Sequence, residues 1–542
     1  MSTPYPSLTD RAVRSHPAVR GDRAGERVRV VVAALLAAAL ALAISVEIPT
    51  PGAGSVVEIL GAMVGVVGVV ALMLSTRYTV TLTLLTLYLG LLDGPVKLLT
   101  GSKYASGFRD VLMISIGLGM LMRLSRKREP VTLPALSGWV LAFVAVVLIE
   151  ALNPSTGGFL KSVAGYRQQL EFVPLFFFGY VIVRNKQRFR QLFLILGVIA
   201  LANGMVSAVQ WRLSPAALAG WGPGYSERIN GRGGRTYVSE GVAHPRPPGL
   251  GSDAGFGGGI GVIALPGLIA LLTVGRMRRR WPVLLCCLGA LVAIATCASR
   301  SSVVNLVVEL VAFAALAALV RIRPTRALSG LAVVAALIAL VVAGLVAVDG
   351  AGIFKRQISL GHVASAVSAE ATGEEREEGE QGGGDAKVKH LSQIPGDILH
   401  EPFGLGLGIA GAVAGLGGKV AKTIEQEKVS GGSAYNLLAV ELGLPGLLLW
   451  VGLTISVLAL ALTRLKQVAD PELRVYLIAI IAAFVALTVQ GLVGPTLAVT
   501  PPGAYLWFAP GVIAYWLAGP GRARTERAVR WRTRVTHPAP AG

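Results

Sequence analysis

The sequence predicts an all-α polytopic integral membrane protein with about 14 transmembrane helices and a large outer loop between late helices. Three observations support this prediction. The chain has 542 residues, of which 53% are hydrophobic and only 15% are charged. Its mean hydropathy of +0.64 is too high for a soluble protein of this length. Its apolar residues also gather in runs that are long enough to cross about 30 Å of hydrocarbon.

The apolar runs, taken in order, define the expected spans. They cover residues 30–46, 56–74, 80–99, 111–122, 136–151, 170–183, 192–211, 260–274, 284–298, 303–320, 331–348, 435–460, 476–493 and 505–517. The residues before the first run are polar and basic, and no small-residue cleavage site follows it. We therefore expect this first run to be retained as a span.

The cations indicate how the chain is oriented. The net charge is +20, but the Lys and Arg residues form short clusters between apolar runs rather than one patch, which argues against a nucleic-acid partner. Clusters in alternate loops mark the cytoplasmic side, and an even number of spans returns both termini to it. These clusters are Arg77, 123–128, 184–190, 276–280, 321–326, Arg464 with Lys466, and 522–534.

Five regions follow from the spans and their orientation. The tract at 370–385 is acidic and rich in glycine, so it cannot bury a core and is expected to be a solvated linker. The regions are a basic cytoplasmic tail (1–29), transmembrane helices 1–11 with an outer loop at 212–256 (30–348), a large outer loop containing the acidic linker (349–432), transmembrane helices 12–14 (433–518) and a second basic cytoplasmic tail (519–542).

Several arginines break the positive-inside bias because they fall at the outer ends of spans or in outer loops. They are Arg109, Arg167, Arg246, Arg300 and Arg356. A guanidinium at this depth costs free energy unless it is compensated. One compensation is an acid partner, with Asp110, Glu150 and Glu171 as candidates; the other is a bound anion, since guanidinium forks suit phosphate oxygens. Asp93 and Lys97 lie one helical turn apart and are expected to pair with each other.

Four segments resemble motifs of the O-antigen ligase and O-antigen or exopolysaccharide polymerase family. Ser299-Arg300 is similar to its Ser-Arg step, and Gly165-Tyr166-Arg167 to its Gly-x-Arg entry. Residues 401–408 (EPFGLGLG) resemble its Pro-x-x-Gly-x-Gly-x-Gly turn, and residues 435–446 (YNLLAVELGLPG) its Tyr-Leu-x-x-x-x-Glu-x-Gly-x-x-Gly run. The four occur in the family's order between about Gly165 and Trp450.

The resemblance implies metal-independent glycosyl transfer, without a cofactor, on the periplasmic face of a bacterial inner membrane. The donor would be a glycan on polyprenyl (undecaprenyl) pyrophosphate, and the acceptor a glycan or a lipid-linked glycan. The enzyme must neutralise the departing pyrophosphate and take a proton from the acceptor hydroxyl. The expected pyrophosphate ligands are Arg167, Arg246, Arg300 and Arg356.

The general base is less clearly marked. Family ligases carry a His-Asn pair before the tyrosine of the last motif, where this chain has Gly432 and Ser433. We take His400, Glu401 and Tyr435 as the candidate catalytic residues; His390, Glu425 and Glu427 lie nearby.

Three alternatives remain open at this stage. The first is a flippase or exporter of lipid-linked oligosaccharide without transferase activity, which would place its charges within spans. The second is a glycosyltransferase that uses polyprenyl monophosphate sugars, although the first outer loop lacks paired acids. The third is a membrane scaffold.

Overall fold

The computed structural model describes most of the chain between residues 86 and 522. The described residues are 86–100, 109, 113, 117, 133–156, 158–230, 236–239, 242–252, 255–274, 280–297, 299–322, 330–341, 343, 384–413 and 433–522. The expected spans at 30–46 and 56–74, the tail at 1–29, most of the acidic linker and Arg356 lie outside the described residues.

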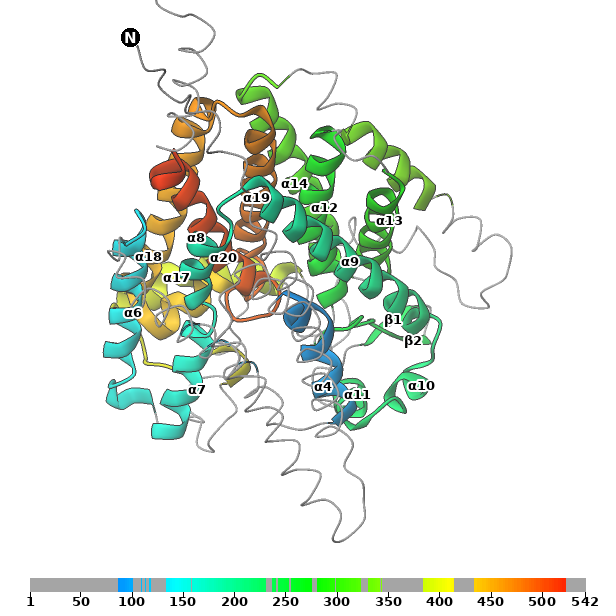
Figure 1. Cartoon of the computed structure of the whole chain (residues 1–542). Coiled ribbons are helices and arrows are strands. Elements are labelled where there is room, and N and C mark those ends of the chain that lie inside the picture. The colour runs from blue at the N-terminus through cyan, green and yellow to red at the C-terminus, as the bar shows by residue number, and fades with distance from the viewer. Residues whose placement is uncertain are drawn as a thin grey trace, which may run out of the picture.

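Helices make up nearly all of the described chain (Figure 1). They are η1 (Tyr88–Leu92), α4 (Asp93–Thr100), α6 (Ser137–Glu150), η2 (Pro154–Thr156), α7 (Phe159–Leu170), α8 (Pro174–Ile182), α9 (Lys186–Trp211), α10 (Pro215–Ala219), α11 (Pro223–Asn230), α12 (Phe256–Val274), α13 (Trp281–Thr296), α14 (Arg300–Leu319), α17 (Gly384–His400), η3 (Gly411–Val413), α18 (Ala434–Arg464), η4 (Leu465–Gln467), α19 (Pro471–Gln490), α20 (Pro502–Ile513) and η5 (Ala514–Ala518). A further apolar helix covers Gly330–Val341.

Five of the described helices are long and apolar enough to cross a membrane, namely α9, α12, α14, α18 and α19. The 26 residues of α9 extend for about 39 Å at 1.5 Å per residue, more than the thickness of the hydrocarbon layer. The chain therefore has the helical, multi-pass architecture that its apolar runs predict. The total of 14 spans stays a prediction.

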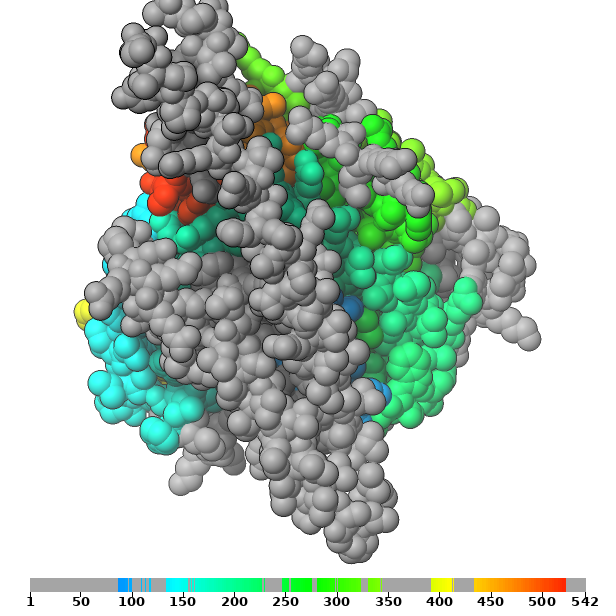
Figure 2. All heavy atoms as spheres, viewed as in Figure 1, coloured from blue at the N-terminus to red at the C-terminus, as the bar shows by residue number. Residues whose placement is uncertain are grey.

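Apolar side chains on the outer surfaces of these helices fit the same architecture. On α6, Leu141, Leu148 and Ile149 are exposed, and on α14, Val304 and Val311 are exposed. Figure 2 shows α6 and α7 at the left edge of the molecule, in cyan. In water such surfaces would be costly, whereas hydrocarbon accepts them.

The structure departs from the expected elements in two places. The run at 170–183 does not form one span, because α7 ends at Leu170 and the nine-residue helix α8 begins anew at Pro174. The loop at 212–256 contains a β-hairpin, in which β1 (Thr236–Ser239) pairs antiparallel with β2 (Val242–Pro245), besides the short helices α10 and α11. The all-α membrane architecture therefore holds for the described residues, and this short loop hairpin is an exception within it.

Small residues allow the helices to approach closely. A Cβ atom on Gly204 of α9 would lie 2.2 Å from the carbonyl oxygen of Gly289 in α13. Likewise, a Cβ on Gly179 of α8 would lie 2.3 Å from the carbonyl oxygen of Phe508 in α20. Close backbone contact of this kind is how helices associate where lipid removes the hydrophobic driving force. Helix α12 lies at the centre, with nearly all of its residues buried.

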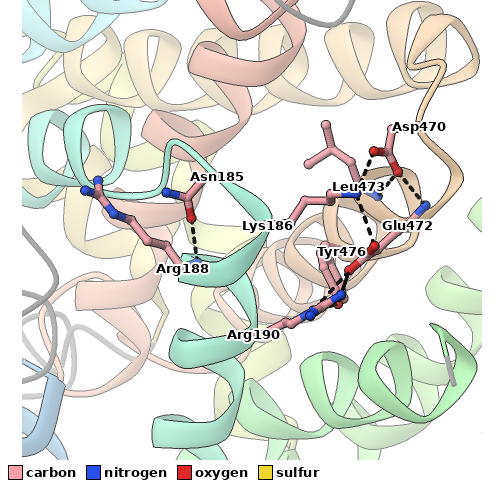
Figure 3. A network of polar contacts seen from close by, with 8 residues as sticks. All are labelled: Asn185, Lys186, Arg188, Arg190, Asp470, Glu472, Leu473 and Tyr476. Carbon is pink, nitrogen blue, oxygen red and sulfur yellow. Dashed lines mark hydrogen bonds and ion pairs between the residues drawn. The ribbon is translucent and has the colours of Figure 1, made fainter. Parts of the chain in front are cut away.

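One end of the bundle is joined by a network of ion pairs (Figure 3). Lys186 at the start of α9 contacts Asp470 at 2.8 Å and Glu472 at 3.2 Å. Arg190, one turn further, pairs with the same Glu472 and donates to the hydroxyl of Tyr476 at 2.9 Å. These contacts fasten the N-terminal ends of α9 and α19 to each other. We call this the network end.

The opposite end holds the segments that carry the four motifs. The backbone N–H of Ala434, which begins α18, donates to Gly491 and Gly494 after the end of α19. Pro501, just before α20, lies beside Gly259 near the start of α12. Helix termini that are distant in sequence therefore meet here, and we call this the motif end.

Candidate functional site

Three of the four motif segments meet at the motif end. Gly165 of α7 lies against the turn at 401–408, because a Cβ on Gly165 would be 2.2 Å from the backbone nitrogen of Gly408. The same turn packs on α18, where the backbone N–H of Leu405 donates to the carbonyl of Val440 at 2.8 Å. Segments that are hundreds of residues apart in sequence thus form one structural unit.

The turn requires glycine at the contact points. Gly404, Gly406 and Gly408 have φ angles of +88°, +91° and +74°, which L side chains rarely adopt. Opposite them, Gly443 interrupts α18 with a φ of +59°. The backbone N–H of Leu444 then donates to the carbonyl of Pro402 at 2.8 Å. The glycine turn fits into the kink of α18.

The carboxylate of Glu441 lies at the centre of this unit. Its side chain is fully buried, at 0% exposure. One carboxylate oxygen accepts the backbone N–H groups of Gly408 at 3.0 Å and Ala410 at 3.2 Å, and the other accepts the side-chain amide of Gln169 at 2.6 Å. Hydrogen bonds to a carboxylate are the compensation that a buried negative charge requires. Glu441 therefore joins α7, the glycine turn and α18.

A second cluster of charged side chains lies beside α7. Lys97 contacts Asp93 at 2.8 Å, which confirms the pair expected from their spacing. Arg109 contacts the same Asp93 at 3.3 Å, forms an ion pair with Glu171 and donates to Thr500 at 2.7 Å. Three sequence-distant regions therefore meet on one buried guanidinium.

Arg167 lies at the edge of this charged cluster. One of its terminal nitrogens is 3.7 Å from Glu171, one turn further along the chain, and its side chain is 37% exposed. The expectation that outer arginines pair with an acid such as Glu171 is confirmed for Arg109 and, at longer distance, for Arg167. Among the described residues, Asp93 and Glu171 thus face Lys97 and the two arginines, which is one more positive than negative charge.

Arg246 follows β2 and begins a turn that is held in place by hydrogen bonds from α9. Gln210 of α9 accepts the N–H of Gly249 at 2.9 Å and donates to its carbonyl at 3.0 Å. The turn also reaches the charged cluster, because a Cβ on Gly94, next to Asp93, would lie 2.2 Å from the carbonyl oxygen of Leu250. The loop that carries Arg246 is therefore in contact with the helix that carries Asp93.

Ser299 and Arg300 lie at the start of α14, also at the motif end. A Cβ on Gly255, just before α12, would lie 3.5 Å from the Ser299 side chain. The hydroxyls of Ser299 and Ser301 are 2.9 Å apart. The Ser-Arg step therefore begins a span where the start of another span approaches it.

The three candidate catalytic residues do not form a catalytic pair among themselves. His400, the last residue of α17, is exposed, and its Nδ1 is 2.8 Å from the carbonyl of Gly396 in its own helix. Glu401 is exposed in the turn that follows. The hydroxyl of Tyr435 donates to the backbone carbonyl of Thr488 at 3.4 Å. His400 and Glu401 are thus adjacent to the glycine turn, and Tyr435 lies against the end of α19.

Sequence reasoning missed the roles of Gln169 and Glu441 as site residues. Glu441 was visible in its motif, but nothing in the sequence indicated that Gln169 is its partner. Within the part of the chain that the structure describes, no group of three or more His, Cys, Asp or Glu residues is placed to hold a metal ion.

Comparison with known proteins identifies no relative. No family model, curated protein or solved structure matches the chain. The geometry of the motif end is therefore the basis for a functional proposal.

Proposed function

We propose that the chain is a membrane glycosyltransferase that moves a glycan from polyprenyl pyrophosphate to a glycan or lipid-linked glycan acceptor. The convergence of three motif segments around Glu441, directly beside the charged cluster, is the observation that carries this proposal. Segments that resemble one enzyme family in sequence order are in contact in space. The O-antigen ligase and polymerase family is the one these motifs resemble.

The charge pattern supports a periplasmic position for the motif end. Basic clusters lie in the loops of the network end, including 184–190 and Arg464 with Lys466. The positive-inside rule assigns such loops to the cytoplasm. We infer a bacterial inner-membrane protein with about 14 spans, both termini in the cytoplasm and the loop at 349–432 in the periplasm.

In this proposal the arginines bind the departing pyrophosphate. Glu171 already has Arg109 as a close partner, whereas Arg167 lies farther away and is partly exposed. Because its side chain is partly exposed, an incoming anion can reach the Arg167 guanidinium. Arg246 and Arg300 sit in segments that reach the same end of the bundle, and Arg356 completes the proposed ligand set. Phosphate oxygens match the planar fork of a guanidinium.

His400 and Glu401 are the proposed sources of the base that takes a proton from the acceptor hydroxyl, with Tyr435 as the third candidate. The two are exposed beside the glycine turn, where a bulky acceptor has room to approach. A general base must come within hydrogen-bond distance of the acceptor oxygen. Neither a metal nor a cofactor is part of this mechanism.

The alternative is a flippase or exporter of the same lipid-linked glycan. One observation favours it: Glu309 lies within the span α14 and is fully buried. Charges inside spans are typical of transport pathways.

Reconstitution separates the two functions. The purified protein is incorporated into liposomes with a lipid-linked repeat unit, and chain length is followed by mass spectrometry with and without EDTA. Longer glycans, formed equally well with the chelator, support the transferase. Movement of the lipid-linked unit across the bilayer without growth indicates the exporter.

Arginine variants test the pyrophosphate site in the same assay. Arg167→Ala and Arg246→Ala are expected to lower elongation at least tenfold, because each removes a cation from the leaving group. Lys466→Ala is the matched control, since this exposed cation lies at the network end. Equal elongation by wild type and both arginine variants contradicts the assigned role.

A further inference from the structure

The carboxyl group of Glu309 is buried inside the membrane-spanning part of α14, and no described residue forms a hydrogen bond with it. Its side chain has 0% exposure. Neither carboxyl oxygen has a hydrogen-bond donor among the described residues. Burying an ionised carboxylate in this way is far more costly than burying a neutral carboxylic acid. An ionisable residue that persists inside a span despite this cost is by default a candidate for function.

Comparison with Glu441 shows that the fold supplies hydrogen-bond donors to another, equally buried carboxyl group. Both glutamates are fully buried. Glu441 receives three hydrogen bonds, from two backbone N–H groups and the amide of Gln169. Glu309 receives none in the described part of the chain. The two buried carboxyl groups therefore differ in whether the described residues supply them with hydrogen-bond donors.

Two buried polar side chains lie on α14 between Glu309 and the motif end. Asn305 lies one helical turn before it and Ser302 nearly one turn earlier still, so the three share a face of α14. Both are 2% exposed, and the amide nitrogen of Asn305 has no hydrogen-bond partner among the described residues. At the motif end of α14, the hydroxyl oxygens of Ser299 and Ser301 are 2.9 Å apart. A narrow polar line thus runs from the motif end into the bundle.

Few titratable groups face this polar line from the neighbouring elements. Helix α14 packs mainly on α19 and α12 (Figure 1). Helix α12 has no titratable side chain, and those of α19 lie in its first turns at the network end. From α20, Tyr505 is close enough to interact electrostatically with Glu309. After α13, Cys297 lies beside Ser302.

We propose that Glu309 is a proton-binding site inside the membrane, and that its proton exchanges with the aqueous phase at the motif end through water that hydrogen-bonds to Asn305 and Ser302. The proposed ligand is a proton rather than a metal ion, since Ca²⁺ or Mg²⁺ needs several oxygen ligands and, among the described residues, Glu309 belongs to no group of three or more His, Cys, Asp or Glu side chains. The site does not depend on glycosyl transfer, because its residues contact neither Glu441 nor the charged cluster. A protein with such a site takes up and releases a proton within the bilayer.

Infrared spectroscopy of the full-length protein in lipid nanodiscs tests the site. A protonated carboxyl group has a C=O stretch separate from those of ionised carboxylates and of the backbone, and this band shifts when deuterium replaces the proton. Wild type is expected to show the band at neutral pH and its shift in D₂O. Glu309→Gln is expected to remove the band, and Glu309→Asp to keep it at a changed frequency.

Two variants complete the design. Glu441→Gln is the matched control, because it removes an equally buried carboxyl that has donors, and it is expected to leave the exchangeable band in place. Asn305→Leu is expected to slow deuterium exchange at least tenfold while the band remains. The proposal is wrong if wild type and Glu309→Gln give the same carboxyl region, or if sodium ions abolish the band at constant pH. An unchanged rate of deuterium exchange in Asn305→Leu contradicts the proposed proton route past Asn305 and Ser302.

Discussion

The side-chain amide of Gln169 donates a 2.6 Å hydrogen bond to the carboxylate of Glu441, although the two residues are 272 positions apart. Both side chains are buried, so the bond is shielded from water. It completes the set of donors around Glu441 and ties α7 to α18. The glycine turn is held between them because Gly408 and Ala410 donate to the same carboxylate.

Gln169→Leu is expected to destabilise the protein by about 1–3 kcal/mol, because it leaves a buried carboxylate oxygen without its donor. Gln169→Glu should cost more, since it places a second carboxyl group against Glu441. Thermal unfolding in detergent measures both. Gln467→Leu is the control, because its amide bonds to Thr463 at the exposed network end. Equal melting temperatures for Gln169→Leu and wild type would show that the hydrogen bond between Gln169 and Glu441 does not stabilise the protein.

Gly443→Ala is expected to disrupt the contact between α18 and the glycine turn. A Cβ at this position would lie 2.3 Å from the carbonyl oxygen of Pro402, and the φ of +59° is itself unfavourable for alanine. We expect a loss of at least about 1–3 kcal/mol from the strained backbone alone. Increased proteolysis within residues 401–413 should accompany the lower melting temperature.

Gly138→Ala serves as the comparison for the glycine variant. A Cβ on Gly138 would meet no atom within 4 Å, and the residue lies inside the regular helix α6. This substitution should leave stability unchanged or slightly raised, because alanine is the better helix former. If Gly138→Ala and Gly443→Ala destabilise the protein equally, the packing of the glycine turn against α18 does not explain the instability of Gly443→Ala.

Arg109→Met is expected to be among the most destabilising single substitutions, at about 3–5 kcal/mol, because it leaves Asp93 and Glu171 buried near each other without their shared cation. Adding Asp93→Asn and Glu171→Gln should recover part of the loss, since both buried carboxylates are then neutralised while Lys97 and Arg167 keep their charges. The measurement is the melting temperature and the yield of monodisperse protein. A triple variant no more stable than Arg109→Met would show that the guanidinium acts through packing on Phe172 instead.

Much of the helical framework was predictable because each span is specified locally. A long apolar run is helical wherever it lies in lipid, since only a helix satisfies its own backbone groups there. The runs at 192–211 and 476–493 accordingly became α9 and α19, with starts shifted to Lys186 and Pro471. The pair of Asp93 and Lys97 was also local, at one helical turn.

The candidate site was only partly predictable because its contacts are not local. The motif at 401–408 indicated a glycine turn, but its fit into the kink at Gly443 depends on how α17 and α18 pack. Gln169 has no feature that distinguishes it from Gln168 beside it, and only the rotation of α7 directs it to Glu441. The hairpin of β1 and β2 lies in a segment that the sequence predicted only as an outer loop.

Acid should weaken the network end through Asp470. Burial acts to raise the pKa of Asp470, but the hydrogen bond from Lys186 and those from the N–H groups of Leu473 and Glu472 outweigh it, so the pKa is lowered. A carboxyl whose pKa is lower in the folded state stabilises fully above its unfolded pKa of about 3.9, and this contribution is lost as pH falls through the folded value.

Asp470→Asn should therefore flatten the fall in melting temperature below about pH 5, while changing stability at neutral pH by less than about 1 kcal/mol, because Lys186 and Asp470 are each about one-third exposed. Asparagine can still accept the N–H groups of the first turn of α19. Asp470→Ala removes that cap as well and should cost about 0.5–2 kcal/mol more at neutral pH. If Asp470→Asn and wild type lose stability in parallel between pH 5 and pH 3, other carboxyl groups account for the acid sensitivity.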